Sequence, residues 1–408
     1  MSRYGDAAPA GACRLTALGM INALGAHPAE IWPRVLAGDQ SRLTPRSDLV
    51  AGRVLHVAEV VDPLPELPSQ LRRYASRTNA LALAAVRQIE ERVRAAIDEF
   101  GADRVGLIVG TSTSGVGEGE RAIRHHVDRG RLPSSFDYAQ LEPGSPAPFL
   151  AAYLGIAGPA YALSTACSSG AKALASARAL LEMRLCDAVV AGAADAVCGL
   201  TANGFGALHL VSSKPSVPFS ANRSGMTIGE GAAFFLVTRE PGGIELLGVG
   251  ECSEATDMSA PDPDGGGAEA AMQAALLDAG LSPDGVSYIG LHGTGTRLND
   301  AMESRAVFRL FGAETWCSAA KALVGHALGA SASIELGCLW LMLEAGRDGV
   351  YPLVPHCWDD TPAPDLPPLR LVRRGDRLLA SSRPVVLLNS FGFGGSDCSL
   401  IIGRAPPC

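Results

Sequence analysis

Short apolar runs alternate with segments of helical periodicity along most of the chain. Four of the runs are typical of buried strands: residues 105–109 (VGLIV), 159–164, 188–191 and 231–238. Residues 78–100 and 171–183 place apolar side chains at helical spacing, and Gly101 ends the first of these segments. Strands that alternate with helices predict an α/β fold in which helices cover a sheet.

The second half of the chain shows the same order of elements. We predict strands at residues 286–291 and 385–388, and helices at residues 268–279, 300–311 and 327–344. The segment VGLIVGTSTSG in the first half resembles VSYIGLHGTGT in the second, and TACSSGAKALASARALLEM resembles VGHALGASASIELGCLWLM. We interpret the likeness as an internal duplication; chance similarity of small-residue β-turn-α units is the alternative.

The duplication divides the chain into two predicted halves. The N-terminal half, residues 1–240, contains an excursion around residues 117–148, where apolar runs are few and a cover for a site or a dimer contact is expected. The C-terminal half spans residues 241–408. A duplication would bring equivalent glycine-flanked turns together, so that each half could supply part of one site.

Composition limits the classes of protein that fit. The 408 residues, of which 47% are hydrophobic, can bury a large core. A formal net charge of -8 argues against nucleic acid as a partner, because phosphate binding requires a basic surface. The ten cysteines include no C-x-x-C pair, so neither a metal site nor a disulfide framework is predicted.

The sequence shows neither a signal peptide nor a membrane-spanning helix. The amino terminus lacks a basic start followed by a continuous apolar core. The most apolar helical stretch, residues 327–343, is short and carries Glu335 near its middle. We therefore expect a cytoplasmic protein with no integral membrane segment.

Cys167 is the candidate nucleophile, and it lies in the N-terminal half. It stands between the apolar run 159–164 and the helix 171–183, where free backbone N–H groups and the positive end of the helix dipole favour a thiolate. The alternative is a small buried hydrophobic residue, which describes most cysteines.

Two histidines and a lysine in the C-terminal half are further candidates. His292 follows a predicted buried strand and precedes Gly-Thr-Gly-Thr, whose small side chains leave room for a substrate. His326 begins a helix behind Gly325, where a neutral imidazole can donate to an anionic oxygen. Lys321 and Glu303 lie beside apolar, glycine-rich segments, and because buried charges need partners we predict that they pair.

Four motifs carry a family resemblance. They are TACSSG at residues 165–170, HGTGT at 292–296 followed by Asp300 and Glu303, KALVGHALGA at 321–330, and NSFGFGG at 389–395. In order and spacing the chain resembles β-ketoacyl-acyl carrier protein synthases of the elongating type II, from about residue 15 to residue 402. The resemblance implies a thiolase fold, in which two duplicated βαβαβ-type halves form a five-layered α-β-α-β-α arrangement.

The resemblance also implies a mechanism. Cys167 would take an acyl chain from an acyl carrier protein thioester, and malonyl-acyl carrier protein would lose CO2 to give an enolate held by His292 and His326. The enolate would attack the acyl group and release a β-ketoacyl product. Lys321 would order the site electrostatically, and the backbone N–H groups of Cys167 and Phe393 would form the oxyanion hole.

Further residues acquire roles by the same resemblance. Phe391 and Phe393 would belong to a glycine-rich gating loop, and Thr294 and Thr296 match positions that bind the pantetheine arm. The protein would need no cofactor of its own, because phosphopantetheine is carried by the acyl carrier protein partner.

The implied partners are an acyl carrier protein and a second subunit, which is either another copy or a ketosynthase-like chain-length factor. Carrier proteins are acidic, and this chain is acidic too, so docking requires a local basic patch. Five basic residues are candidates for that patch: Arg72, Arg73, Arg77, Lys214 and Arg223.

The pathway and two other functions stay open. Phe219 and Ser220 stand where housekeeping fatty-acid enzymes commonly have Trp-Asp or Phe-Asp, so a specialised cluster, such as one making aryl polyene pigments, fits as well as primary lipid synthesis. A chain-length factor is one alternative, although such subunits usually replace the nucleophile. A thiolase-type acyltransferase is the other, although Cys398 and Cys408 lack the Cys-x-Gly context of a second catalytic cysteine.

Overall fold

The N-terminal half forms a five-stranded sheet in the computed structural model, which describes residues 13–240, 242–380 and 383–404. The strands lie in the order β1 (Arg14–Asn22), β8 (Gly231–Thr238), β6 (Ala188–Asp195), β4 (Val105–Gly110) and β5 (Ala160–Leu163). β4 is parallel to both β5 and β6, whereas β8 is antiparallel to both β6 and β1.

The C-terminal half repeats this strand order. Its strands are β9 (Ile244–Ser253), β16 (Ser396–Arg404), β15 (Val385–Gly392), β10 (Tyr288–Gly290) and β11 (Trp316–Ser318), with β13 (Arg370–Leu371) at the edge. β10 is parallel to β11 and β15, and β16 is antiparallel to both β15 and β9. Five strands of each half match in order and direction, which confirms the predicted duplication. β1 and β9 join the two sheets through a short antiparallel pairing.

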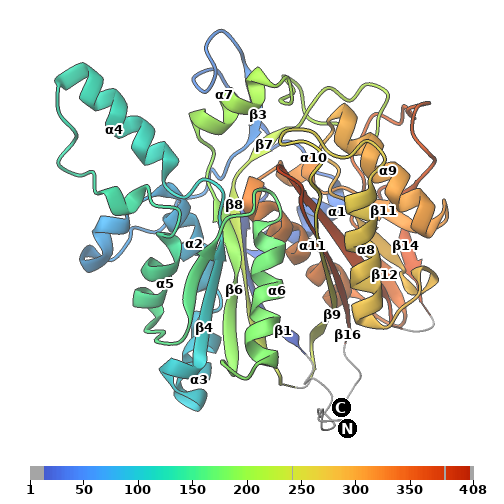
Figure 1. The fold of residues 1–408 in the computed structure, drawn as a ribbon, viewed down its shortest axis with the longest axis horizontal. Coiled ribbons are helices and arrows are strands. Elements are labelled where there is room, and N and C mark those ends of the chain that lie inside the picture. Colours follow the sequence, from blue (N-terminus) through green and yellow to red (C-terminus); the bar gives the residue numbers. More distant parts are fainter. Residues whose placement is uncertain (1–12, 241, 381–382, 405–408) are drawn as a thin grey trace.

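Helices cover both sheets and fill the space between them (Figure 1). In the central layer, α6 (Ser169–Glu182) packs on β4 and β6, and α11 (Ser331–Ala345) packs on β8 and β15. The outer helices are α2 (Arg77–Arg87), α3 (Glu90–Phe100) and α5 (Pro146–Leu154) on the first sheet, and α8 (Gly266–Ala279) and α9 (Arg297–Phe311) on the second. The layers therefore follow the predicted α-β-α-β-α arrangement.

The side chains of β4 show how the layers are joined. Leu107 and Val109 belong to the hydrophobic cluster beneath α2 and α5, whereas Ile108 belongs to the cluster between the two sheets. Successive side chains of a strand point to opposite faces, and helices cover both faces here. The strand consequently has the continuous apolar sequence from which it was predicted.

One helical stretch, Leu328–Ala345, is long and apolar enough to cross a membrane by length and composition, and 78% of it is buried inside the protein. It lies in the central layer, where a Cβ on Gly337 would come within 2.7 Å of the Met20 sulfur. Helices buried on all sides are apolar all round. The stretch is therefore a core helix.

The long helix predicted over residues 78–100 is wrong, because the chain breaks it into α2 and α3. At the break, the Gln88 side-chain amide donates to the carbonyl oxygens of Met20 and Ala26 at 3.1 and 2.8 Å, and its oxygen accepts from the Met20 N–H at 3.1 Å. A polar side chain that bonds β1 at this position satisfies main-chain groups that lie outside the helix. The apolar periodicity of residues 78–100 does not reveal this tertiary contact, so it could not predict the break.

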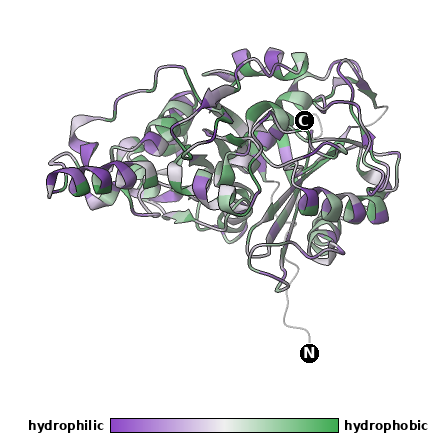
Figure 2. Ribbon diagram, turned by 90° about the horizontal axis from the view of Figure 1, so that it is seen from above, coloured by the Kyte–Doolittle hydropathy of each residue, from purple (hydrophilic) through white to green (hydrophobic). Residues whose placement is uncertain are grey.

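The predicted excursion, residues 117–148, lies outside the layers up to residue 145, where α5 follows. It contains most of α4 (Val116–Arg129), which projects from the body in Figure 1 and is largely hydrophilic in Figure 2. The remaining elements are α1 (Pro28–Ala37), β2 (Thr44–Arg46), β3 (Leu55–Ala58), α7 (Gly199–Ala207), β7 (Ile228–Gly229), α10 (Lys321–Val324), β12 (Val350–Pro352) and β14 (Arg377–Leu379). Short 3-10 turns are Ser69–Tyr74, Ala102–Arg104, Tyr138–Gln140, Pro283–Gly285 and Leu328–Ala330.

Candidate active site

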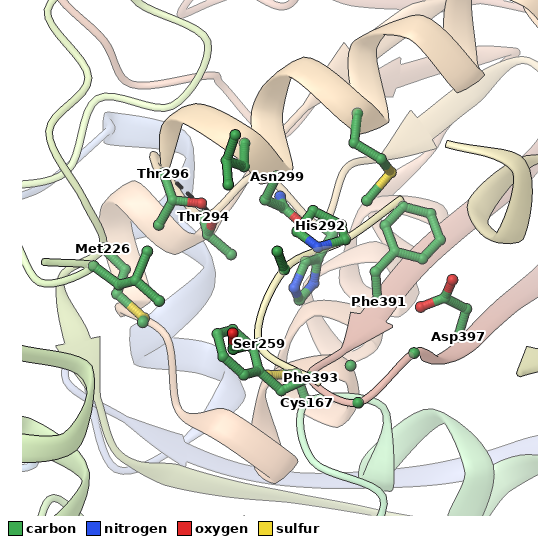
Figure 3. A pocket seen from close by; sticks show the side chains of 18 of the residues that line it. Cys167, Met226, Ser259, His292, Thr294, Thr296, Asn299, Phe391, Phe393 and Asp397 are labelled. Carbon is green, nitrogen blue, oxygen red and sulfur yellow. Dashed lines mark hydrogen bonds between the residues drawn. The ribbon is translucent and has the colours of Figure 1, made fainter. Parts of the chain in front are cut away.

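Cys167 lies in a tight turn between β5 and α6, at the bottom of a pocket (Figure 3). Ala166 precedes it with a φ of 53°, a left-handed conformation that non-glycine residues rarely adopt. The Ser169 hydroxyl donates to the Ala166 carbonyl at 2.6 Å, and the Ser390 hydroxyl donates to the Cys167 carbonyl at 2.9 Å. These bonds fix the strained turn and hold the thiol at the start of α6.

Burial raises the pKa of the Cys167 thiol to about 11, although the charge of Lys321 and the backbone N–H of Phe393 oppose the shift. The sequence predicted that the helix end would favour a thiolate. Desolvation outweighs the lowering effects of Lys321 and the backbone N–H groups, so the raised pKa favours the thiol form at neutral pH, in contrast to the predicted thiolate. Its activation needs a nearby proton acceptor.

His292 and His326 supply imidazole nitrogens beside the thiol. One side-chain nitrogen of each and the Cys167 sulfur all lie within 4.8 Å of one another. His292 follows β10 and His326 follows α10, and the two rings meet edge to face at 5.5 Å between centroids. Residues from both halves of the duplication thus converge on one point.

Both histidines are neutral. Burial lowers the pKa of each well below its usual range, and the charge of Lys321 lowers both further. The Lys321 ammonium lies 3.3 Å from His292 Nδ1. An ammonium can only donate, so Nδ1 accepts and Nε2 carries the hydrogen. His326 Nδ1 lies 2.7 Å from the Ser331 hydroxyl, which can donate or accept.

The predicted pairing of Lys321 with Glu303 is wrong. Lys321 Nζ instead donates to both carboxylate oxygens of Glu335, at 2.9 and 2.7 Å, and both side chains are buried. Glu335 lies on α11, in the central layer directly beneath the site. Burial raises its pKa to about 6, against the lowering effect of Lys321. A carboxylate in the middle of an apolar helix was the signal in the sequence for this pair.

Glu303 serves the histidine loop instead. Its two oxygens accept the backbone N–H groups of His292 and Gly293, each at 2.7 Å, and the Asn389 amide donates to it at 3.2 Å. Burial raises the pKa of Glu303 to about 7, and these donors oppose that shift. The carboxylate therefore fixes the backbone that presents the His292 ring.

Asp300 plays a similar role one turn earlier on α9. It accepts the N–H groups of Gly295 at 3.1 Å and of Phe219 at 2.7 Å. Asp195, which the sequence did not single out, is buried and accepts from the side chain and N–H of Thr113 and from the N–H of Ala330. It joins a loop of the first half to the start of α11.

The pocket above the thiol contains the predicted substrate and gate residues (Figure 3). Thr294 and Thr296 line one side, and their hydroxyls lie 2.9 Å apart. The Phe391 ring lies 5.9 Å from that of His292, and the Phe393 ring packs edge to face on Phe205 at 5.4 Å. The structure thus brings all four side chains to the pocket that holds Cys167.

The predicted basic patch divides into exposed and engaged residues. Arg72, Arg73 and Lys214 are exposed. Arg77 bonds the buried carboxylate of Glu230 through Nε at 2.9 Å, and Arg223 is 1% exposed and bonds Asp365 at 2.8 Å. Arg77 and Arg223 therefore already engage carboxylates of this chain, whereas Arg72, Arg73 and Lys214 are the exposed members of the predicted patch.

Comparison with known proteins assigns the family. Residues 16–241 match the description "Beta-ketoacyl synthase, N-terminal domain", and residues 244–354 match "Beta-ketoacyl synthase, C-terminal domain". The chain belongs to the beta-ketoacyl synthase family. Over 413 residues this beta-ketoacyl synthase is 29% identical to 3-oxoacyl-[acyl-carrier-protein] synthase 2 of Coxiella burnetii, a match that covers 96% of this chain and 98% of that protein.

Two further relatives cover almost the whole chain. Nodulation protein E of Rhizobium leguminosarum bv. trifolii is 29% identical over 408 residues, 95% of this chain and 97% of that protein. A chain of the solved complex between the ketosynthase ApeO and its chain length factor ApeC, from Xenorhabdus doucetiae, is 41% identical with a TM-score of 0.91, covering 98% of this chain and 100% of that chain. The beta-ketoacyl synthase fold is thus shared from end to end.

The intact triad Cys167, His292 and His326 distinguishes this beta-ketoacyl synthase from a non-catalytic chain-length factor. The thiolase alternative gains no support, because Cys398 is buried in β16 and burial raises its pKa. Cys408 lies outside the described residues. The chain is therefore a ketosynthase, an acyltransferase that condenses acyl groups.

Proposed function

We propose that this ketosynthase carries out decarboxylative condensation of an acyl chain on Cys167 with malonyl-acyl carrier protein. One observation carries the proposal: a buried thiol and two neutral imidazoles lie within 4.8 Å of one another at the bottom of a pocket. A thiol can form a thioester with an acyl group, and the N–H groups of neutral imidazoles can donate hydrogen bonds to an enolate oxygen.

In the first half-reaction, the Cys167 sulfur attacks the thioester carbonyl of the acylated carrier. The bond from sulfur to the acyl carbon forms, and the bond to the pantetheine sulfur breaks. The thiol proton passes to the departing pantetheine sulfur, which leaves as a thiol, while the neutral His326 keeps its hydrogen on Nε2 and its Nδ1 accepts from Ser331. The N–H groups of Cys167 and Phe393, which favour negative charge on the Cys167 sulfur, stabilise the oxyanion.

In the second half-reaction, the malonyl thioester lies along Thr294 and Thr296. Its bond to the carboxylate breaks, CO2 leaves, and the electron pair moves to an enolate whose oxygen accepts from His292 and His326. The enolate carbon then attacks the acyl carbonyl and displaces the Cys167 thiolate, which takes up a proton from solvent to regenerate the thiol. Lys321 transfers no proton, because it is held by Glu335; its charge keeps the imidazoles neutral.

Replacing His292 with alanine tests this division of labour. We expect malonyl decarboxylation to fall about 10²- to 10³-fold, the effect of removing one donor from a developing oxyanion. Acyl transfer to Cys167 should be retained, since His292 Nδ1 faces Lys321 and does not accept the thiol proton. Release of CO2 and mass spectrometry of the acylated protein measure the two steps. His27→Ala, which removes an exposed histidine, is the control.

If His292→Ala abolished acyl transfer and left decarboxylation unchanged in a folded protein, the assigned role of this histidine would be wrong. Equal partial losses of acyl transfer and of decarboxylation would also contradict this role, because the two steps use different hydrogen-bond donors.

The proposed partners are an acyl carrier protein and a second ketosynthase-like subunit, in the cytoplasm. The Xenorhabdus doucetiae ketosynthase forms a complex with its chain length factor. A heterodimer with such a factor, in a specialised polyene or polyketide pathway, is our proposal for this chain; the 41% identity to a chain of that complex and the Phe219-Ser220 pair support it.

Charge reversal at Arg72 and Arg73 tests the docking surface. These residues are exposed, and at 3.9 Å the contact of Arg73 with Asp137 engages that side chain only loosely. The double variant should raise the KM for carrier-bound substrates about tenfold or more, with kcat for a free pantetheine thioester unchanged. Arg184→Glu, a charge reversal at an exposed site just beyond α6, is the control. An unchanged KM would remove these residues from the proposal.

A further inference from the structure

Two acidic side chains meet beside the turn that follows Phe391. Asp397 lies opposite Phe391 in the pairing of β15 with β16 and is 2% exposed. Glu254 follows β9, and both residues line the pocket that holds Cys167. Figure 3 shows the Asp397 carboxylate beside the Phe391 ring.

The two carboxylates approach each other over Gly267 at the start of α8. A Cβ on Gly267 would lie 2.5 Å from Glu254 Oε2 and 3.0 Å from Asp397 Oδ2, so both oxygens border the same small space. Both oxygens are buried and have no hydrogen-bond partner among the described residues. Two buried carboxylates that border the same small space repel each other when both are ionised.

The pair joins two segments that border the thiol. The Glu254 N–H donates to the Gly395 carbonyl at 2.8 Å, and a Cβ on Gly395 would lie 2.0 Å from the Glu254 carbonyl oxygen. Gly395 closes the turn that begins at Gly392, with an N–H to carbonyl bond of 3.0 Å. Phe393, whose N–H acts on the Cys167 sulfur, lies inside that turn. A movement of Glu254 would therefore shift this turn and with it the Phe393 N–H.

The charges around Asp397 favour its neutral form. Burial and then Glu254 raise its pKa to about 7, while the Gly392 N–H and Lys172 of α6 lower it and Glu303 of α9 raises it slightly. Cys252 lies opposite on β9, and the neighbouring Cys398 lies on β16; burial raises the pKa of both thiols. Lys172 is itself engaged by Glu251 at 3.3 Å.

We propose that Glu254 and Asp397 share one proton and act as positioning residues for the 392–395 turn. The shared proton lets one carboxyl donate to the other and keeps the turn seated on Glu254. When the pair loses that proton, the carboxylates repel, the turn loosens, and the Phe393 N–H leaves its place beside Cys167. The consequence for catalysis rests on the proposed function, whereas the coupling of the two segments does not.

Asp397→Asn and Glu254→Gln test the pair without changing side-chain shape. Each amide can donate to the remaining carboxylate at every pH, so each variant should keep the turn seated. Hydrogen exchange of residues 391–397 should be compared between the wild type and Asp397→Asn at the same pH. Near pH 6 the two proteins should exchange at equal rates. Near pH 8.5 the wild type should exchange several-fold faster. Condensation in the wild type should fall over the same range relative to both variants.

The matched control is Asp257→Asn, which removes an exposed carboxylate from the same loop and keeps its acceptor for the Ser259 and Ala260 N–H groups. It should follow the wild type. Equal exchange in wild type and Asp397→Asn at every pH, or an Asp257→Asn response like that of Asp397→Asn, overturns the inference. A difference in exchange in a protein that does not condense would leave the inference standing and remove only the proposed function.

Discussion

Replacing Cys167 with glutamine should abolish condensation and leave malonyl decarboxylation in place. Glutamine offers no nucleophile, so no acyl chain is held, and the loss of condensation should be about 10⁴-fold or more. His292 and His326 are positioned by Lys321 and Ser331 and not by the thiol, so the enolate donors remain. Product formation and CO2 release from malonyl-acyl carrier protein measure the two activities separately.

The control for this variant is Cys198→Ser, because Cys198 is about as buried but lines a different pocket, where its thiol contacts the Thr201 hydroxyl. It should keep both activities. Loss of both activities in a folded Cys167→Gln protein would contradict the division of labour between thiol and histidines, and residual condensation would contradict the covalent route.

Removing Lys321 should have the largest effect on stability. Lys321→Met leaves the Glu335 carboxylate buried without a partner, and breaking a buried pair in this way costs about 3–5 kcal/mol of unfolding free energy. With the lysine present the pKa of Glu335 is about 6, and without it the carboxyl should stay protonated to higher pH. The deficit should therefore shrink as pH falls through that region, as urea unfolding at several pH values would measure.

The double variant Lys321→Met with Glu335→Met separates stability from catalysis. Replacing both charges with apolar groups should recover most of the unfolding free energy. Activity should stay low, because His292 then loses the ammonium that lowers its pKa and orients its ring. Lys172→Met, which breaks the partly exposed pair with Glu251, should cost less than about 1 kcal/mol. If Lys321→Met alone were as stable as the wild type, the stabilising role of the Lys321–Glu335 pair would be wrong.

The layered fold was predictable because strands covered on both faces leave continuous apolar runs. β4, β8 and β15 were found in this way. β1, β9 and β16 were not, since threonine, glycine and acidic residues interrupt their apolar pattern. The break at Gln88 was also missed, because it depends on hydrogen bonds to Met20 of β1, 68 residues away in the sequence.

The sequence predicted which residues react, but it did not predict which charged side chains pair with one another. Motifs place Cys167, His292 and His326 at the ends of elements, where the duplication brings them together. The carboxylate that meets Lys321 depends on how α11 packs beneath α10, so the sequence favoured Glu303, which follows the HGTGT motif, over Glu335. Arg77 and Arg223 show the same limit, since a basic side chain in a sequence does not reveal the carboxylate that engages it.

Mass spectrometry of the acyl group on Cys167 is the most direct test of whether this cysteine holds the acyl chain. The protein would be incubated with an acylated carrier protein, digested and mapped at all ten cysteines. We predict one acyl group per chain, on the peptide containing Cys167, and its loss with formation of a β-ketoacyl product when malonyl-acyl carrier protein is added. An acyl group on another cysteine, or none on Cys167 in a preparation that forms product, would contradict the account.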